Sequence, residues 1–94
     1  MQLFMVIEHF RAGQAASVYR RFQERGRMAP SGLTYMGSWV DMDFQRCFQV
    51  MRADDVSLLG EWTANWEDLV DFEIIPVRTS EEAAAAIWVE IRKD

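Results

Sequence analysis

The sequence has 94 residues, of which half are apolar and 13% are aromatic, and its formal net charge is −5. This length supports one domain, and the apolar content excludes a disordered chain. The acidic balance argues against nucleic acid and anionic membranes as partners, since both attract clustered Lys and Arg. We therefore expect a single soluble domain over residues 1–94, with its core at 2–78.

Cysteine usage and the start of the chain indicate the compartment. Cys47 is the only cysteine, so no intrachain disulfide can form and a reducing environment fits best. The first residues lack a basic leader, and Glu8 and His9 interrupt their apolar run, so we expect no signal peptide. No apolar run approaches the roughly 18–20 residues that span a bilayer. These features predict a cytoplasmic protein.

The first half of the chain predicts three strands and one helix. Residues 2–10 are apolar on both alternating faces, which is typical of a central strand buried on both sides. Residues 14–27 have apolar side chains at the spacing of a helix, with Gly26 as its stop. Residues 33–41 and 45–53 predict two strands joined by a short hairpin connection.

The second half predicts a helix and a fourth strand. Asp54 or Asp55 is a suitable N-cap for a helix that runs to about Leu69. Residues 70–77 alternate as a strand, and Pro76 suits an edge strand because it cannot donate a ladder hydrogen bond.

The element order predicts the fold class. Thr79 and Glu82 match a capping box, so residues 80–92 predict a final helix. The preceding order, strand–helix–strand–strand–helix–strand, is the split βαβ pattern. Right-handed crossovers place both helices on one side of a four-stranded antiparallel sheet, with the first and third strands central. We expect an α+β, ferredoxin-like βαββαβ sandwich with a C-terminal helix.

One face of such a sheet carries no helix. The two central strands offer apolar residues to both faces, and simple alternation places Tyr35 and Trp39 on the same face of the second strand. The resulting patch would exceed the roughly 300–600 Å² that monomers usually expose. We therefore expect a second copy to cover it, giving a homodimer through the open sheet face.

Several segments carry a resemblance to a known family. A family of short bacterial proteins with no assigned function has similar sequences at LFMVIEHF, VYRRFQERGRM, GSWVD, RCFQVM and LVDFEIIPV. This resemblance covers about residues 3–80. More broadly, the chain resembles the dimeric α+β barrel superfamily, which includes cofactor-independent monooxygenases, muconolactone-isomerase-like enzymes, stress-response barrel proteins and ligand-sensing modules. The resemblance implies fold and dimer, and no catalytic residue is carried over, because function does not follow fold.

A few side chains are candidates for chemistry. His9, the only histidine, could move a proton near its ordinary pKa of about 6.5, or it could simply bond to backbone or solvent at a strand end. Tyr35 and Trp39 could line a cavity or pack in the dimer interface. With one His and one Cys, we expect no metal site. The candidate ligand-binding residues are His9, Tyr35, Trp39, Met51 and Trp62.

Two charged groups have plainer explanations. The arginines of the first helix region suggest a solvated face, although an anionic ligand or a second subunit could also use them: Arg11, Arg20, Arg21, Arg25 and Arg27. Asp71 and Glu73 share a strand face. Solvation of an edge strand explains them better than a role as paired carboxylates in acid–base catalysis.

Three functions remain open from the sequence. The first is a homodimer that binds a small molecule in a pocket between sheet and helices, without a cofactor. The second is a cofactor-independent monooxygenase- or isomerase-like enzyme in which His9 shuttles a proton and Tyr35 orients the substrate. The third is a purely structural interaction module. Whether the protein is an enzyme is left undecided.

Overall fold

The computed structural model describes residues 2–92 of the chain. The order of its elements and their packing confirm the predicted α+β, ferredoxin-like sandwich with a C-terminal helix. The elements are β1 (Gln2–Phe10), α1 (Ala15–Arg25), β2 (Leu33–Val40), β3 (Arg46–Ala53), α2 (Ser57–Thr63), β4 (Val70–Val77) and α3 (Ser80–Arg92). In this part of the chain, no helix is both long and apolar enough to cross a membrane.

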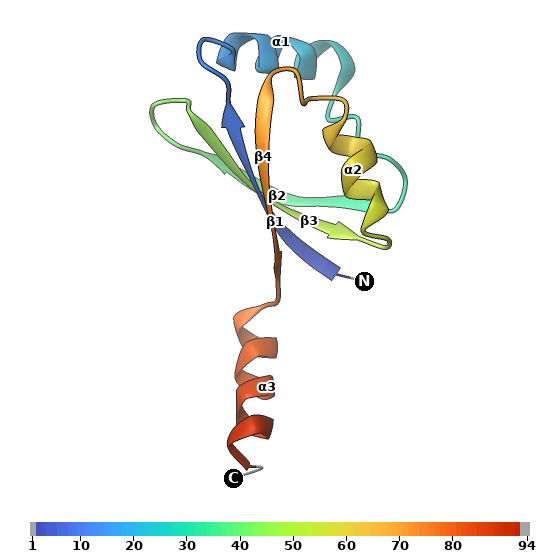
Figure 1. The fold of residues 1–94 in the computed structure, drawn as a ribbon, viewed down its shortest axis with the longest axis vertical. Coiled ribbons are helices and arrows are strands. Elements are labelled where there is room, and N and C mark those ends of the chain that lie inside the picture. The colour runs from blue at the N-terminus through green and yellow to red at the C-terminus, as the bar shows by residue number, and fades with distance from the viewer. Residues whose placement is uncertain (1, 93–94) are drawn as a thin grey trace.

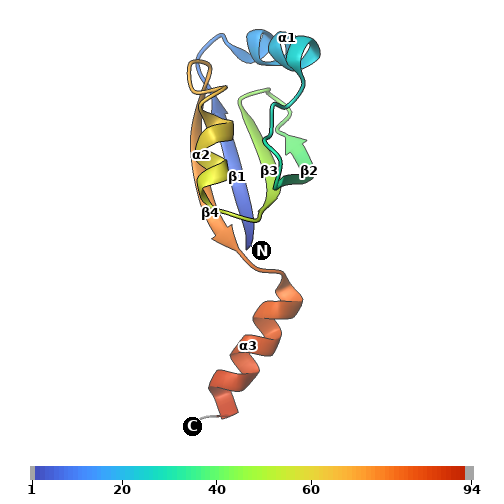
Figure 2. The same ribbon diagram turned by 90° about the vertical axis from the view of Figure 1, so that its right-hand side faces the viewer.

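The four strands form one antiparallel sheet in the order β2-β3-β1-β4, so β1 and β3 are central as predicted. Among the described elements, α1 and α2 lie on one side of the sheet, and no helix covers the other side (Figures 1 and 2). We call these sides the helix face and the open face. β4 is an edge strand, which accommodates Pro76.

The hydrophobic core lies between the helix face and the two helices. Phe4 and Val6 of β1 and Met51 of β3 point into it, and each is at most 4% exposed. Leu59 and Trp62 of α2 pack in the same cluster. Burying one such side chain contributes roughly 1.5–3 kcal/mol, so this layer is the main source of stability.

A β-bulge in β2 changes which residues share a face. Tyr35 is aligned with Met51 of β3, whereas Gly37 is aligned with Val50, the residue next to Met51. One extra residue therefore interrupts the alternation. Tyr35 lies on the helix face and Trp39 on the open face, so the prediction that they share a face is wrong. Alternation by two assumes a strand without a bulge.

α2 is shorter than the predicted helix, which was expected to run to about Leu69. It ends at Thr63, after which the N–H of Trp66 bonds to the C=O of Thr63 and the N–H of Leu69 to the C=O of Trp66. Such bonds wind the backbone more tightly than an α-helix does. At the start, the Asp55 carboxylate accepts bonds from the N–H and hydroxyl of Ser57, at 2.9 and 2.8 Å.

α1 is tied to the segment after α2 by one charged pair. The two terminal nitrogens of Arg21 each donate to a carboxylate oxygen of Asp68 at 2.7 Å, and one also donates to the C=O of Asn65 at 2.9 Å. A two-pronged pair of this kind fixes orientation as well as distance. The helix stops at Gly26, as predicted, where a φ of 69° favours glycine.

α3 projects away from the rest of the molecule (Figure 1). The predicted capping box is present: the N–H of Thr79 donates to Glu82 Oε1 at 3.2 Å, and the N–H of Glu82 donates to Thr79 Oγ1 at 3.1 Å. No described residue of α3 is buried. More than half of each large apolar side chain on it is exposed: Ile87, Trp88, Val89 and Ile91.

Candidate functional site

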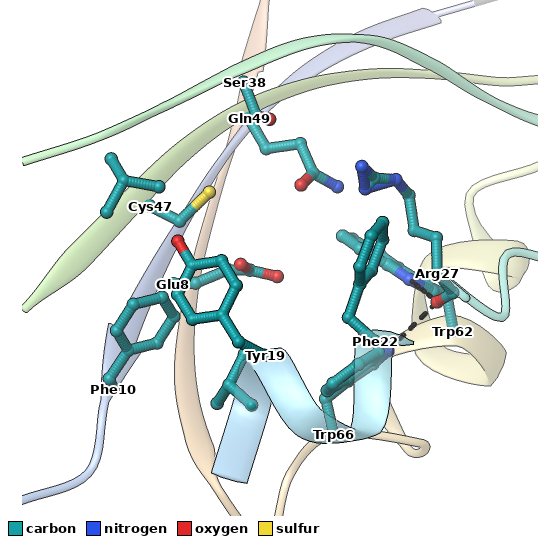
Figure 3. Close-up of a pocket in the computed structure, with 12 residues that line it drawn as sticks. Glu8, Phe10, Tyr19, Phe22, Arg27, Ser38, Cys47, Gln49, Trp62 and Trp66 are labelled. Atoms are coloured by element: carbon teal, nitrogen blue, oxygen red, sulfur yellow. Dashed lines mark hydrogen bonds between the residues drawn. The ribbon is translucent and has the colours of Figure 1, made fainter. Parts of the chain in front are cut away.

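A cavity of about 240 Å³ lies between α1 and the helix face of the sheet (Figure 3). Aromatic rings make up much of its wall, and a few polar groups reach into it. The polar lining consists of Glu8, Tyr19, Arg27, Ser38, Cys47 and Gln49, and the apolar lining of Phe10, Val18, Phe22, Val40, Trp62 and Trp66. A mostly apolar hollow with a small number of converging polar groups is typical of small-molecule sites.

Two tryptophans hold one end of the cavity in place. The indole N–H groups of Trp62 and Trp66 both donate to the backbone C=O of Arg27, each at 3.0 Å (Figure 3). The two rings are almost fully buried, so these bonds satisfy donors that would otherwise be costly to bury. Although Arg27 lies outside any helix or strand, its backbone position is therefore well defined.

The side chain of Arg27 is held by aromatic rings rather than by an acid. Its guanidinium carbon lies 3.7 Å from the ring centre of Tyr35 and 5.1 Å from that of Phe22. Such contacts stabilise a cation. Among residues 2–92, no carboxylate forms an ion pair with it. Its charge therefore remains available to a polar group inside the cavity.

Glu8 brings a carboxyl group to the same cavity. Its side chain points from β1 into the hollow (Figure 3). Burial raises the pKa of Glu8, while a hydrogen bond with the Cys47 thiol and the charge of Arg27 act in the opposite direction. A carboxyl group with a raised pKa in a cleft is a candidate for proton exchange.

The other ionisable groups of the cavity remain protonated at neutral pH. Burial raises the pKa of the Cys47 thiol to about 12, and the nearby Glu8 adds to the effect. Burial also raises the pKa of Tyr19, helped by Cys47 and Glu8. Cys47 is buried. Since the thiolate is the nucleophilic form of cysteine, Cys47 is not poised for covalent chemistry.

Gln49 is the one buried polar side chain of the described core, at 3% exposure. Its amide nitrogen donates to the sulfur of Met51 at 3.2 Å, and sulfur is a weak acceptor. The amide also lines the cavity (Figure 3). It therefore has hydrogen-bonding capacity left for a bound molecule.

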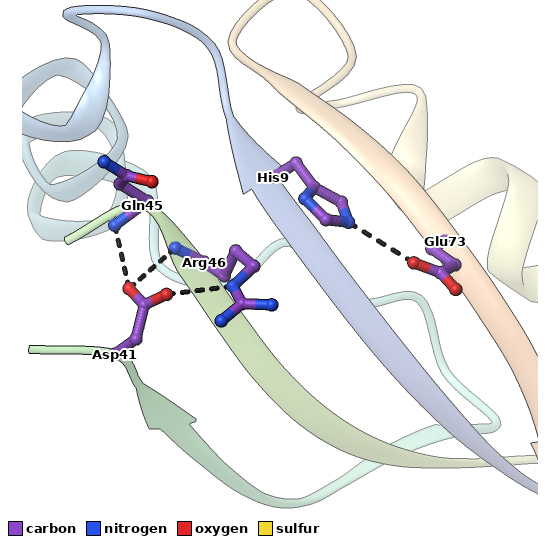
Figure 4. A network of polar contacts seen from close by, with 5 residues as sticks. All are labelled: His9, Asp41, Gln45, Arg46 and Glu73. Atoms are coloured by element: carbon purple, nitrogen blue, oxygen red, sulfur yellow. Dashed lines mark hydrogen bonds and ion pairs between the residues drawn. The ribbon is translucent and has the colours of Figure 1, made fainter. Parts of the chain in front are cut away.

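His9 follows Glu8 in the chain and lies on the opposite face of the sheet. Its Nε2 is 3.3 Å from Glu73 Oε1 on the neighbouring edge strand (Figure 4). Both side chains are about half exposed. In the same view, Asp41 accepts bonds from the backbone of Gln45 and Arg46 and pairs with the Arg46 side chain at 2.9 Å, which closes the β2–β3 hairpin.

The structure does not bring the five predicted ligand-binding residues together. Trp62 lines the cavity and Met51 is buried in the core. The ring of Tyr35 lies against the guanidinium of Arg27. His9 and Trp39 lie on the open face, outside the cavity. A ligand role for residues on the open face remains a prediction.

Sequence reasoning missed Glu8, Arg27 and Gln49 as a group. The strand pattern contained the signal for two of them, because continuing the inward alternation of Phe4 and Val6 leads to Glu8. In β3 the same alternation places Gln49 between inward-facing neighbours. Arg27 follows no periodic pattern. The sequence groups it with the other arginines of the first helix region, for which a solvated face is the plainest explanation and an anionic ligand or a second subunit the alternatives.

Comparisons with other proteins place the chain in a family without assigning it an activity. Within residues 2–92, no three His, Cys, Asp or Glu side chains gather as they would around a metal ion. No curated protein and no solved structure matches the chain. A family model described as "Domain of unknown function (DUF3303)" matches residues 2–88. Since this match covers nearly all of the sequence, the chain belongs to the DUF3303 family.

Proposed function

We propose that this protein binds a small, mostly apolar molecule carrying a polar oxygen, in the cavity between α1 and the sheet. The observation that carries the proposal is the guanidinium of Arg27, which forms no ion pair with any carboxylate of residues 2–92 and lies against the rings of Tyr35 and Phe22 at the edge of an apolar cavity. Glu8 and Gln49 face the same space. Rings would supply contact area, and these three groups would orient the oxygen.

The size of the cavity limits the ligand. Drug-sized ligands occupy pockets of roughly 300–1,000 Å³, and a cavity of about 150 Å³ holds benzene. At about 240 Å³, this cavity fits a molecule of one or two small rings.

Binding can be tested by NMR with 2-indanone and 2-naphthol as probes. The four indole N–H signals report separate places, because Trp62 and Trp66 line the cavity whereas Trp39 and Trp88 lie outside it. We expect the first two signals to shift and the other two to stay. No saturable shift of the Trp62 or Trp66 signal with either probe would contradict the proposal.

A filled cavity provides a matched control. Val40 lines the cavity, whereas Val56 is 63% exposed before α2. Val40→Phe should weaken binding of both probes at least tenfold, and Val56→Phe should leave it unchanged. If both variants bound the probes equally well, the probes would bind outside the cavity, which would contradict the proposed site.

We further propose that two copies associate through the open face. The described apolar side chains of that face are Leu3, Met5, Ile7, Trp39, Phe48, Val50, Ile75 and Val77. Trp39 is 64% exposed although it is among the largest of them. Contiguous apolar surface of this kind marks interaction sites, and a two-fold pairing of one patch with itself is the commonest assembly.

Sedimentation tests this association. Ile7 is central to the face, aligned between Phe48 and Glu73 on its neighbouring strands. Ile7→Glu should give a monomer with an unchanged circular dichroism spectrum, because the side chain is outside the core. Met42, 96% exposed in the hairpin, is the control, and Met42→Glu should remain dimeric. A monomer mass for the unmodified protein at micromolar concentration would refute the dimer.

A further inference from the structure

We propose that the cavity is also a site of proton transfer at carbon, where the Glu8 carboxylate removes a proton beside a carbonyl group and Arg27 holds the resulting enolate oxygen. The inference rests on the proposed ligand binding and adds a reaction to it. The substrate class is a small, ring-bearing ketone with an acidic C–H bond. The reaction class is keto–enol tautomerisation or the related migration of a double bond.

The placement of the two charged groups supports this inference. Glu8 enters the cavity from β1, and Arg27 enters it from the segment between α1 and β2 (Figure 3). They do not form an ion pair with each other. A base and a cation that face one apolar hollow without neutralising each other directly leave room for a substrate between them.

The chemistry balances without a further reactant. The C–H bond next to the carbonyl breaks, its electron pair forms a carbon–carbon double bond, and the carbonyl π electrons move onto the oxygen. The proton goes to a Glu8 oxygen, and the guanidinium of Arg27 stabilises the new negative charge. Glu8 then returns the proton to the enolate oxygen or to another carbon. Nothing is oxidised or reduced.

The surroundings of Glu8 suit a base of this kind. A general base works best when its pKa lies near the working pH, and burial raises the pKa of this carboxyl group. The ionisable groups that face it are Cys47 from β3, Tyr19 from α1 and Arg27 from the loop. Cys47 and Tyr19 stay protonated at neutral pH, so they do not compete for the proton.

The neighbouring histidine cannot take this role inside the same cavity. His9 is on the opposite face, beside Glu73 and away from the aromatic lining. The strand therefore separates the two acid–base groups that lie next to each other in the sequence.

The experiment is deuterium exchange of 2-indanone in D₂O, followed by loss of its CH₂ signals in the NMR spectrum. The unmodified protein should exchange these protons faster than buffer alone. Glu8→Gln should lower the protein-dependent rate about 10²–10⁴-fold, the usual contribution of a general base. Arg27→Met should lower it about 10²–10³-fold, as expected for loss of a group that stabilises an oxyanion.

Matched controls separate these effects from general loss of charge. Glu61→Gln on the exposed side of α2 and Arg20→Met on α1 remove the same charges outside the cavity, so both should exchange at the unmodified rate. The rate of the unmodified protein should rise with pH and level off above the raised pKa of Glu8. That rise should be absent in Glu8→Gln.

The outcomes distinguish this inference from the proposed binding. If 2-indanone shifts the Trp62 and Trp66 signals but exchanges no faster than in buffer, the proton-transfer inference is overturned and binding stands. If 2-naphthol binds and 2-indanone does not, the ketone class is overturned. If neither binds, both proposals are overturned. A rate that survives Glu8→Gln but is lost in His9→Gln would move the chemistry to the open face and overturn the assignment.

Discussion

The two faces of the sheet are built from the same strands but have different surroundings. On the helix face, α1 and α2 enclose a core and a cavity with a few polar groups. On the open face, apolar side chains lie beside solvent with no described helix over them. Glu8 and His9 are neighbours in the chain, yet one has a pKa raised by burial and the other is half exposed beside Glu73. Position on the strand, rather than residue type, decides which acid–base group meets the cavity.

The largest expected effect on the free energy of unfolding comes from replacing a tryptophan by alanine on the helix side of the sheet, and Trp39 on the open face provides the comparison. Trp62 is 1% exposed, bonds to the C=O of Arg27 and packs with its ring centre 5.9 Å from that of Phe72. Trp62→Ala should lower the free energy of unfolding by about 3–5 kcal/mol, because it leaves a large void in the core. The measurement is urea denaturation followed by circular dichroism.

Trp39→Ala is the matched change on the open face. In the dissociated chain it should alter the free energy of unfolding by no more than about 0.5 kcal/mol, as surface substitutions usually do. Its main effect should be weaker self-association at micromolar concentration. If both tryptophans destabilised the dissociated chain equally, the distinction between the two faces would fail.

Glu8→Gln should change how stability depends on pH. The pKa of Glu8 is raised in the folded state, so above its ordinary value of 4.5 the folded chain holds a proton that the unfolded chain releases. Stability therefore falls as pH rises from that value through the raised pKa. Glu8→Gln should be more stable than the unmodified protein at pH 7, and the gain should vanish below pH 4.

Thermal unfolding across this pH range measures the effect. Glu61→Gln, on an exposed helix position, should show no comparable gain at pH 7. A loss of stability in Glu8→Gln at pH 7 would mean that the ionised carboxylate stabilises the folded state rather than destabilising it.

Asp68→Asn should have a smaller effect of opposite sign. The Arg21 guanidinium lowers the pKa of Asp68 to about 2. The pair therefore stabilises the fold above the ordinary pKa of 3.8, and this contribution is lost as pH falls through about 2. Because Asp68 is 60% exposed and Arg21 is partly exposed, solvent weakens the pair, and the lowering of the melting temperature at pH 7 should be modest. The difference in melting temperature between Asp68→Asn and the unmodified protein should shrink toward pH 2. Glu67→Gln nearby should neither lower the melting temperature at pH 7 nor show this pH dependence.

Thr79→Ala should leave global unfolding unchanged. It removes a capping box worth about 1 kcal/mol to the helix that it caps, but no described residue of α3 is buried. Faster amide hydrogen exchange confined to α3 is the expected result. A lowered midpoint for the whole domain would instead show that α3 contributes to the stability of the folded domain.

Several features followed from the sequence because they depend on local spacing. Hydrophobic alternation located all four strands, Gly26 ended α1, and Thr79 with Glu82 began α3. Pro76 correctly indicated an edge strand. The length of α2 could not be predicted, because the helical spacing of Trp62 and Trp66 continues through tighter turns that keep both rings buried.

The candidate site was harder to predict, because it depends on contacts between distant segments. The bulge that separates Tyr35 from Trp39 exists only in the pairing of β2 with β3. The position of Arg27 depends on two indoles that follow it by 35 and 39 residues. Neither feature has a periodic signature.

By itself, the sequence determined the element order, the two central strands and the apolar residues on both faces of those strands, because alternation and composition are properties of the chain. Tertiary structure alone decided which face the helices cover. That choice turns Glu8 into the cavity and leaves His9 half exposed on the open face, and it brings Arg27 to the cavity. The physical reason is that the side chains of successive residues in a strand point in opposite directions, so covering one face assigns opposite environments to neighbours that the sequence alone cannot tell apart.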